Sequence, residues 1–185
     1  MKKKKTVIIL ASFLVAILII CGVLVYRSIA KTAIIKQCDK YIHLYEYDIL
    51  PDEYRKDKYP ECIIPEDFIN NKLFEIENQY YELFGETKYN DEVLKKREWF
   101  NNKIITGEVI LRDYDISIKN INSFKLTNIK EAEIFIVVSQ KGTDMVKDGS
   151  SYTDEPFNAD VGYKITFEKI EDQWKIMKVT FIPVL

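Results

Sequence analysis

The chain has 185 residues and a formal net charge of −2, and setting aside Lys2 to Lys5 changes that charge to −6 for the remainder. A surface this acidic lacks the basic face that binds the phosphates of DNA or RNA, and it disfavours tight docking on anionic lipid headgroups. Nucleic acid is therefore excluded as a partner. The many Lys, Asn, Ile and Tyr residues suggest an AT-rich genome, and we expect a Gram-positive bacterium.

Residues 6–26 form an uncharged apolar run directly after the lysine block. A hydrocarbon core about 30 Å thick needs roughly 20 apolar residues of helix to cross it. Lysines mark the cytoplasmic end of such a helix. We expect a cytoplasmic tail at residues 1–5, a transmembrane helix at 6–26 that binds the membrane, and an extracytoplasmic domain at 27–185.

Two other fates of this N-terminus remain open. A cleaved signal has a shorter apolar region and small residues at its cleavage site. A lipoprotein signal would place a small residue before the lipidated cysteine, whereas Ile20 precedes Cys21. The length and the bulky neighbour favour an uncleaved anchor over cleavage or lipidation.

Three helices are expected next. Apolar residues recur at three- and four-residue spacing from Ser28 to Asp48, so the membrane helix can run on with little break. Pro65-Glu66-Asp67 suits the start of a second helix, and Gly85 is placed to cap its C-terminus. Asn90 can cap a third helix, which would end near Phe100.

From residue 108 the period changes to two. Short strands are expected at 108–113 and 116–119, and a longer one carries Ala132, Ile134, Ile136 and Val138 on one face. The turn Glu171-Asp172-Gln173 joins the last two strands into an antiparallel hairpin. In the last strand the apolar set changes phase after Ile176, which predicts a bulge or a strand buried on both faces.

The stretch 142–160 is the longest polar segment between strands, and we interpret it as a mobile hairpin loop. Its acidic residues do not match the spacing of a calcium loop, so no metal site is expected. The residues proposed for contact with a partner are Tyr152, Asp154, Glu155 and Phe157.

The terminal hairpin YKITFEKIEDQWKIMKVTF, Tyr163 to Phe181, resembles that of the nuclear transport factor 2-like (NTF2-like) superfamily. The resemblance implies an α+β fold in which helices pack on a curved antiparallel sheet that forms a cone. The layout of short tail, membrane helix and exterior domain is similar to that of VirB8-like components of conjugative secretion. It is also similar to the extra N-terminal domain of some penicillin-binding proteins.

Catalytic signals are weak. His43 is the single histidine, without a nucleophile or second ligand beside it, and Asp113-Tyr114-Asp115 is expected to be a polar turn whose side chains diverge. Cys38 and Cys62 can be buried thiols or an exterior disulfide. We expect no enzyme activity, no cofactor and no metal.

The expected function is an interaction or scaffold module of a bacterial envelope assembly, with conjugative secretion as one system of this kind. Its partners would be other envelope proteins or further copies of the chain. The alternative is a small-molecule or cell-wall-fragment binding domain that uses the cavity of the cone. The cavity lining discriminates between them, because an open apolar pocket favours the binding domain and a filled cone favours the scaffold.

Overall fold

The computed structural model describes residues 2–184, with side chains described for residues 12–86 and 88–184. The chain divides into two compact units, Met1–Lys36 and Gln37–Leu185. Helix α1 (Lys2–Ile42) continues without a break from the apolar run, as the spacing of apolar residues predicted. The side chains of the lysine block lie outside the described ones, so the cytoplasmic tail stays a prediction.

The first unit carries one helix that is long and apolar enough to cross a membrane. Among the described side chains of residues 12–25, the large apolar ones are exposed, for example Phe13 and Leu18 at 67% and 66%. This exposure separates the segment from the buried core helix of a soluble domain. Length and composition are thus those of a single membrane-spanning helix.

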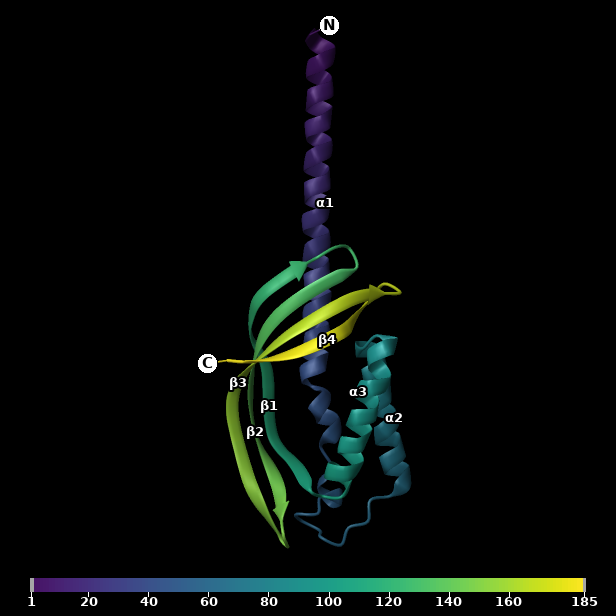
Figure 1. Cartoon of the computed structure of the whole chain (residues 1–185), viewed down its shortest axis with the longest axis vertical. Helices are drawn as coiled ribbons and strands as arrows, with labels where there is room; N and C mark the ends of the chain where they lie inside the picture. The colour runs from purple at the N-terminus through teal and green to yellow at the C-terminus, as the bar shows by residue number, and fades with distance from the viewer. Residues whose placement is uncertain (1, 185) are drawn as a thin grey trace. The chain divides into compact units, whose positions relative to one another are not determined.

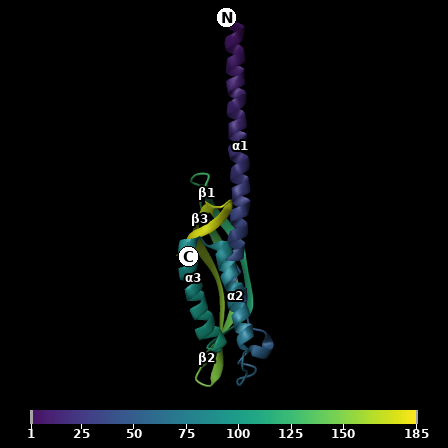
Figure 2. The ribbon, with the colours of Figure 1, turned by 90° about the vertical axis from the view of Figure 1, so that its right-hand side faces the viewer.

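The second unit begins with the end of α1 and a short 3-10 helix η1 (Leu44–Asp48). Helices α2 (Glu66–Leu83) and α3 (Glu86–Trp99) then form an antiparallel pair, side by side in Figure 2. A π-helix, η3 (Phe100–Ile105), follows α3. Pro65 directly precedes α2, as predicted, because proline fits the start of a helix.

The junction between α2 and α3 differs from expectation. From the sequence, the third helix was expected to start after Asn90, and Gly85 was expected to cap the C-terminus of the second helix. Instead α2 ends at Leu83, and Gly85 directly precedes α3. The buried Phe84 forms a parallel bridge with Ile176 of β4, and this bridge holds the backbone extended and stops α2.

Four antiparallel strands form one sheet in the order β1-β2-β3-β4. Their bounds are β1 Val109–Leu126, β2 Glu131–Asp148, β3 Ser151–Ile170 and β4 Gln173–Pro183. The sheet curves, and its concave side turns toward α2 and α3 (Figure 1). Ala132, Ile134, Ile136 and Val138 are all buried on one face of β2, as predicted.

Two predictions about strands are wrong. The expected strands at 108–113 and 116–119 form one strand, and Asp113 and Tyr114 lie at a bulge within it, with Asp113 at φ 56°. The expected loop at 142–160 consists of paired strands joined by the two-residue turn Gly149-Ser150. The positive φ of Gly149 permits this tight turn, so strand pairing continues through a polar, exposed sequence.

The terminal hairpin is confirmed, with β3 and β4 joined at Glu171-Asp172. The phase change in β4 is a bulge: Thr166 pairs with Lys178 and Phe167 with Ile176, so Met177 is the extra residue. Trp174 and Ile176, before the bulge, are buried. The expected α+β class, with a long apolar N-terminal helix followed by helices and a curved antiparallel sheet, is confirmed.

Candidate functional site

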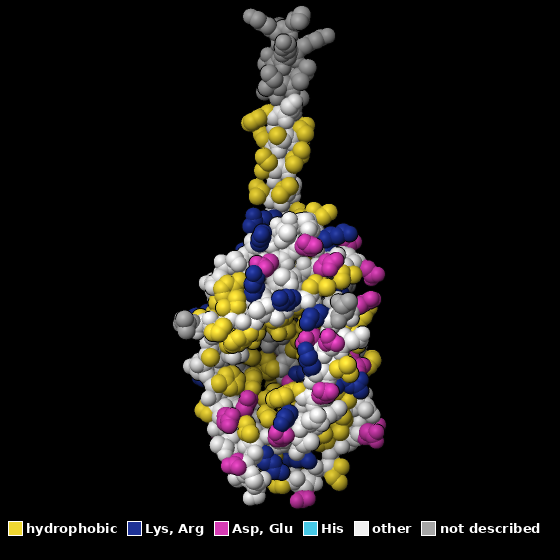
Figure 3. All heavy atoms as spheres, in the orientation of Figure 1, with side chains coloured by type: hydrophobic (Ala, Val, Ile, Leu, Met, Phe, Trp, Pro, Cys, Tyr) yellow, Lys and Arg dark blue, Asp and Glu magenta, His cyan; other side chains and the backbone are white. Residues whose placement is uncertain are grey.

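The second unit contains two adjoining cavities that share Tyr41 and Tyr163 as walls, with volumes of about 250 and 260 Å³. We call them together the aromatic groove. Figure 3 shows a hollow between the sheet and α3, with hydrophobic side chains inside it. The inner cavity is further lined by Ile42, Leu44, Tyr45, Tyr80, Tyr114, Ile116, Val138 and Gln140. The outer one is further lined by Lys88, Glu92, Val179 and Phe181.

Ring contacts connect the mouth of the aromatic groove to its interior. Phe181, which is 61% exposed, meets Tyr163 edge-on at 6.2 Å between ring centroids. Tyr163 meets Tyr41 at 6.0 Å, and Tyr41 meets Phe84 at 6.1 Å, both edge-on. Such arrangements are the favoured ones for aromatic pairs, so the walls hold each other in place.

A second row of rings lies beside the inner cavity. Tyr114 stacks on Tyr45 at 4.8 Å and meets Phe157 edge-on at 5.0 Å. Its hydroxyl donates a hydrogen bond to the carboxylate of Asp144. Gly142 makes room for this row, since a Cβ there would lie 2.7 Å from the Phe157 ring.

The groove offers hydrogen-bonding groups that the described residues do not use. The hydroxyls of Tyr41, Tyr80 and Tyr163 have no hydrogen-bond partner among the described residues, and Tyr80 is only 9% exposed. Burial raises the pKa of each of these three phenols above its ordinary value. They therefore stay protonated at neutral pH, and they can donate hydrogen bonds but do not act as bases.

The outer cavity of the groove is lined by two charged side chains. The Nζ of Lys88 and the Oε1 of Glu92, both on α3, lie 3.9 Å apart and form a half-buried ion pair. The inner cavity is lined by tyrosines, aliphatic residues and the amide of Gln140. Since no charged side chain is among the described residues that line it, this cavity offers no counter-charge and suits an uncharged group.

The residues considered for catalysis do not come together. His43 lies between α1 and η1, where its Nδ1 is 2.8 Å from the carbonyl oxygen of Asp39, and it lines neither cavity. Of the Asp113-Tyr114-Asp115 set, Tyr114 lines the inner cavity while both aspartates are exposed. The fold gathers Tyr41, Tyr45, Tyr80 and Tyr163 in the groove, and the sequence analysis named none of them as a site residue.

The acidic residues of 142–160 have other contacts. Asp144 binds Tyr114, and Asp154 lies 3.0 Å from Arg112 in an ion pair. Within the described part of the chain, no group of three or more metal-binding side chains is found. Cys21, Cys38 and Cys62 are free thiols, with Cys38 buried.

The four residues proposed for partner contact all lie on β3, and alternation along the strand places them on two faces. Tyr152 donates a hydrogen bond from its hydroxyl to the carbonyl of Gly107 at 2.7 Å, so it fastens the β2–β3 turn to the start of β1. Asp154 pairs with Arg112. Glu155 is exposed, and Phe157 is half-buried against Tyr114. Their contact with a partner stays a prediction.

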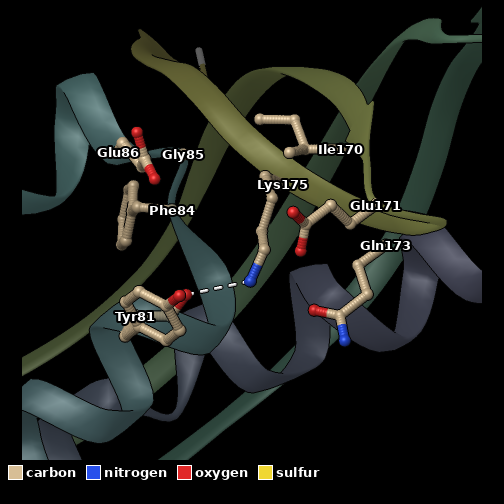
Figure 4. Close-up of a pocket in the computed structure, with 8 residues that line it drawn as sticks. All are labelled: Tyr81, Phe84, Gly85, Glu86, Ile170, Glu171, Gln173 and Lys175. Atoms are coloured by element: carbon tan, nitrogen blue, oxygen red, sulfur yellow. Dashed lines mark hydrogen bonds between the residues drawn. The ribbon is translucent and has the colours of Figure 1, made fainter.

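A separate cavity of about 200 Å³ lies between the β3–β4 turn and the α2–α3 junction (Figure 4). Lys175 reaches across it and donates hydrogen bonds to the carbonyls of Tyr81 and Glu82, each at 2.9 Å. These are among the last carbonyls of α2, which lack partners within the helix. Lys175 therefore has a structural role in capping α2, and we assign no ligand to this cavity.

Comparison with known proteins gives a likeness of fold only. No family model matches the sequence, and no curated protein is significantly similar to it. An NTF2-like protein of unknown function from Prochlorococcus marinus is similar over 46% of this chain, at 17% identity and a TM-score of 0.34. The match spans 59% of that protein.

The intermembrane-space region of the chloroplast protein ARC6 is similar over 66% of this chain and all of its own length, at 8% identity and a TM-score of 0.40. At these values neither likeness assigns a family or a function. The chain's α+β class and strand order stand on the structure itself.

Proposed function

We propose that the chain is a single-pass membrane protein whose exterior domain binds partners and does not catalyse a reaction. Residues 6–26 would span the membrane, with residues 1–5 in the cytoplasm and residues 27–185 outside. The apolar, exposed helix and the lysine block before it support this topology.

The proposal that the domain does not catalyse a reaction is supported by the side chains that line the aromatic groove. Its interior collects protonated phenols, whereas acid–base catalysis needs a positioned group whose pKa lies near the working pH. The charged pair at the mouth, Lys88 with Glu92, is half-buried, and its two charges oppose each other. Such a lining can stack and donate hydrogen bonds, which are the means of binding.

The finer assignment is an envelope assembly of a Gram-positive bacterium, with conjugative secretion as one candidate system. The support is the layout of tail, membrane helix and exterior domain, which VirB8-like components share. Partners would be other envelope proteins or further copies of this chain. The acidic domain argues against nucleic acid.

Protease accessibility tests this proposal. Trypsin added to intact, wall-stripped cells should degrade the domain and leave a small membrane fragment, because the lysines and arginines beyond residue 26 would lie outside. Inside-out vesicles are the control, since in them the domain should be protected. A protected domain in intact cells, a soluble product that begins near residue 27, or lipid on Cys21 would contradict it.

A second candidate function is favoured by the unpartnered hydroxyls of Tyr41, Tyr80 and Tyr163. The groove is open at Phe181 rather than filled, which favours binding of a small uncharged molecule or a cell-wall fragment. N-acetylglucosamine and glucose, titrated against the labelled protein by NMR, would test this. Tyr163→Phe should weaken binding several-fold, and Tyr59→Phe, at an exposed site outside the groove, should not. Absence of binding by both sugars would remove the cell-wall candidate.

A further inference from the structure

Strand β3 has a free edge that β4 does not cover. β4 pairs with residues 161–170 of β3, so residues 151–160 pair with β2 on one side and, among the described residues, with no strand on the other. Figure 1 shows this half of β3 as the outermost strand of the sheet. Seven of its ten side chains are exposed, and the rest are half-buried.

The direction of the backbone groups at this edge follows from the hydrogen bonds of β2. The N–H of Lys147 donates to the carbonyl of Glu108, on the β1 side of β2. Lys147 therefore makes no ladder bond with its partner Tyr152, whose N–H and C=O must point away from β2. Alternation extends this outward direction to Asp154, Pro156, Asn158 and Asp160.

The position of Pro156 is consistent with its backbone groups pointing away from β2. Proline has no N–H, so it is tolerated in a strand where that group would face solvent. The edge accordingly presents N–H groups from four residues and carbonyls from five. The outward groups of Tyr152, Asp154, Pro156 and Asn158 face no strand of the described residues, because the pairing with β4 begins at Val161.

The opposite edge of the sheet is less suited to pairing. β1 shows three register shifts along its contact with β2, and bulges of this kind twist an edge away from new partners. β3 keeps an unbroken register with β2 from Ser151 to Glu168. The straight, regular edge is therefore the one on β3.

The side chains along this edge are acidic. Asp154, Glu155 and Asp160 occur there without any basic residue. Arg112 and Lys119 reach across from β1 to Asp154 and Asp160, at 3.0 and 2.6 Å. Glu155 has no ion-pair partner among the described residues, which leaves one unbalanced charge beside the half-buried ring of Phe157.

We propose that residues 152–160 of β3 accept an extended, basic segment of a partner protein as a fifth strand. The segment would run antiparallel to β3, in line with β4, and bond to the outward N–H and C=O groups. The inference rests on the proposed interaction function, for which it names the contact surface. It also gives the expected contact residues Glu155 and Phe157 a shared role.

The geometry of an antiparallel pair fixes the pattern of the incoming segment. Glu155 and Phe157 lie on the same face of β3, so the two residues opposite them lie on one face of the new strand. An apolar residue would face Phe157, and a lysine or arginine two positions later would face Glu155. Because Pro156 has no N–H, one carbonyl of the incoming segment receives no hydrogen bond. This loss is the same for every segment, whatever its sequence.

The test uses two capped peptides, TVTVTKT and TVTVTET, with the full chain in detergent micelles. The lysine peptide should shift the amide signals of Asp154, Asn158 and Asp160 and bind more tightly than the glutamate peptide. Glu155→Lys should reverse that preference, changing each affinity by roughly three- to tenfold. Asn158→Pro, which removes an outward N–H, should weaken both peptides, whereas Asn158→Ala keeps the N–H and should bind normally.

The proposal fails if neither peptide binds at millimolar concentration, if Glu155→Lys leaves the preference unchanged, or if the shifts fall on β1. Self-association that Asn158→Pro abolishes would assign the edge to a second copy of the chain instead. These outcomes are independent of the protease test, so an inward-facing domain would contradict the proposed function while the peptide result stands on its own.

Discussion

Trp174 is the first large side chain after the β3–β4 turn, and its ring is 5% exposed. Its neighbour on the same face, Ile176, is fully buried, so the two anchor β4 in the core before the bulge at Met177. Trp99, the other tryptophan, ends α3 with 39% of its surface exposed. The two rings therefore differ in what their removal would cost.

Trp174→Ala should lower the free energy of unfolding by about 3–5 kcal/mol, the range for a buried aromatic cut to alanine. Urea unfolding of the wild type and the variant would measure the difference. Trp99→Ala is the control and should have a smaller effect, because its ring already contacts water and its removal costs chiefly a hydrogen bond to the buried Asp48. A Trp174 variant with unchanged stability would show that the hairpin does not anchor the core.

His43→Ala should leave the cellular role intact. The imidazole contacts the carbonyl of Asp39 and the ring of Tyr45 and lines no part of the aromatic groove. Complementation of a deletion strain, with protein abundance checked by immunoblot, is the measurement. Loss of function by a folded variant at normal abundance would require a chemical or contact role for His43.

At the scale of elements, the β3–β4 hairpin combines a strained turn with a bulge. Glu171 and Asp172 adopt φ values of 47° and 64°, in the left-handed region that suits two-residue hairpin turns but disfavours side chains with a Cβ. The Asp172 side chain is 97% exposed, and its contact with Lys169 is a surface ion pair. Such a pair contributes little to stability.

Asp172→Gly should stabilise the domain by roughly 0.5–1 kcal/mol, because glycine adopts positive φ without a Cβ clash, a gain partly offset by its greater freedom when unfolded. A shift of the thermal midpoint to higher temperature is the expected readout. Asp172→Ala removes the same carboxylate but keeps the Cβ, so it should give no gain. Equal stabilisation by both variants would trace the effect to charge instead.

The sequence predicted an element correctly where the spacing of its apolar residues distinguishes buried from exposed positions. The phase change around Met177 predicted the bulge because buried and exposed positions exchange there. The segment 142–160 carries few apolar residues, since much of its length is exposed, and its pairing could not be read from periodicity. The α2–α3 junction was misplaced because Phe84 is held by Ile176, a contact between residues distant in sequence.

The groove could not have been derived from the sequence. Tyr41 lies at the end of α1 and Tyr163 on β3, and each alone fits the core of a helix or a strand. Their convergence depends on the curvature of the sheet. A sequence signal did exist in the excess of tyrosine, whose polar end needs water or a partner even when its ring is buried.

At the scale of the whole molecule, the second unit buries many phenols in its interior. Burial raises the pKa of Tyr41, Tyr80, Tyr114 and Tyr163, and the hydrogen bond to Asp144 contributes at Tyr114. In the unfolded chain these groups ionise near their ordinary pKa of 10.0. The folded state therefore holds protons that the unfolded state has lost at high pH.

The domain should lose stability as the pH rises above about 10. More protons are bound to the folded than to the unfolded state in this range, so the free energy of unfolding falls with increasing pH. Burial lowers the pKa of Lys175, which opposes the trend with a single group. Urea unfolding from about pH 8 to about pH 11 would measure the slope. Tyr163→Phe should reduce it, and a flat profile would place the phenols in water.

The order of the strands in the sheet has a consequence for how the chain folds during synthesis. Each strand after β1 pairs with the one that precedes it in sequence, so the backbone groups of the sheet find partners in neighbouring segments, whereas the α2–α3 junction waits for Ile176 of β4. Folds built from neighbouring segments lose less chain entropy on closing their loops and form quickly. With its N-terminal helix leading, the chain can assemble the sheet strand by strand as it emerges, and α2 and α3 gain their apolar cover as each strand arrives.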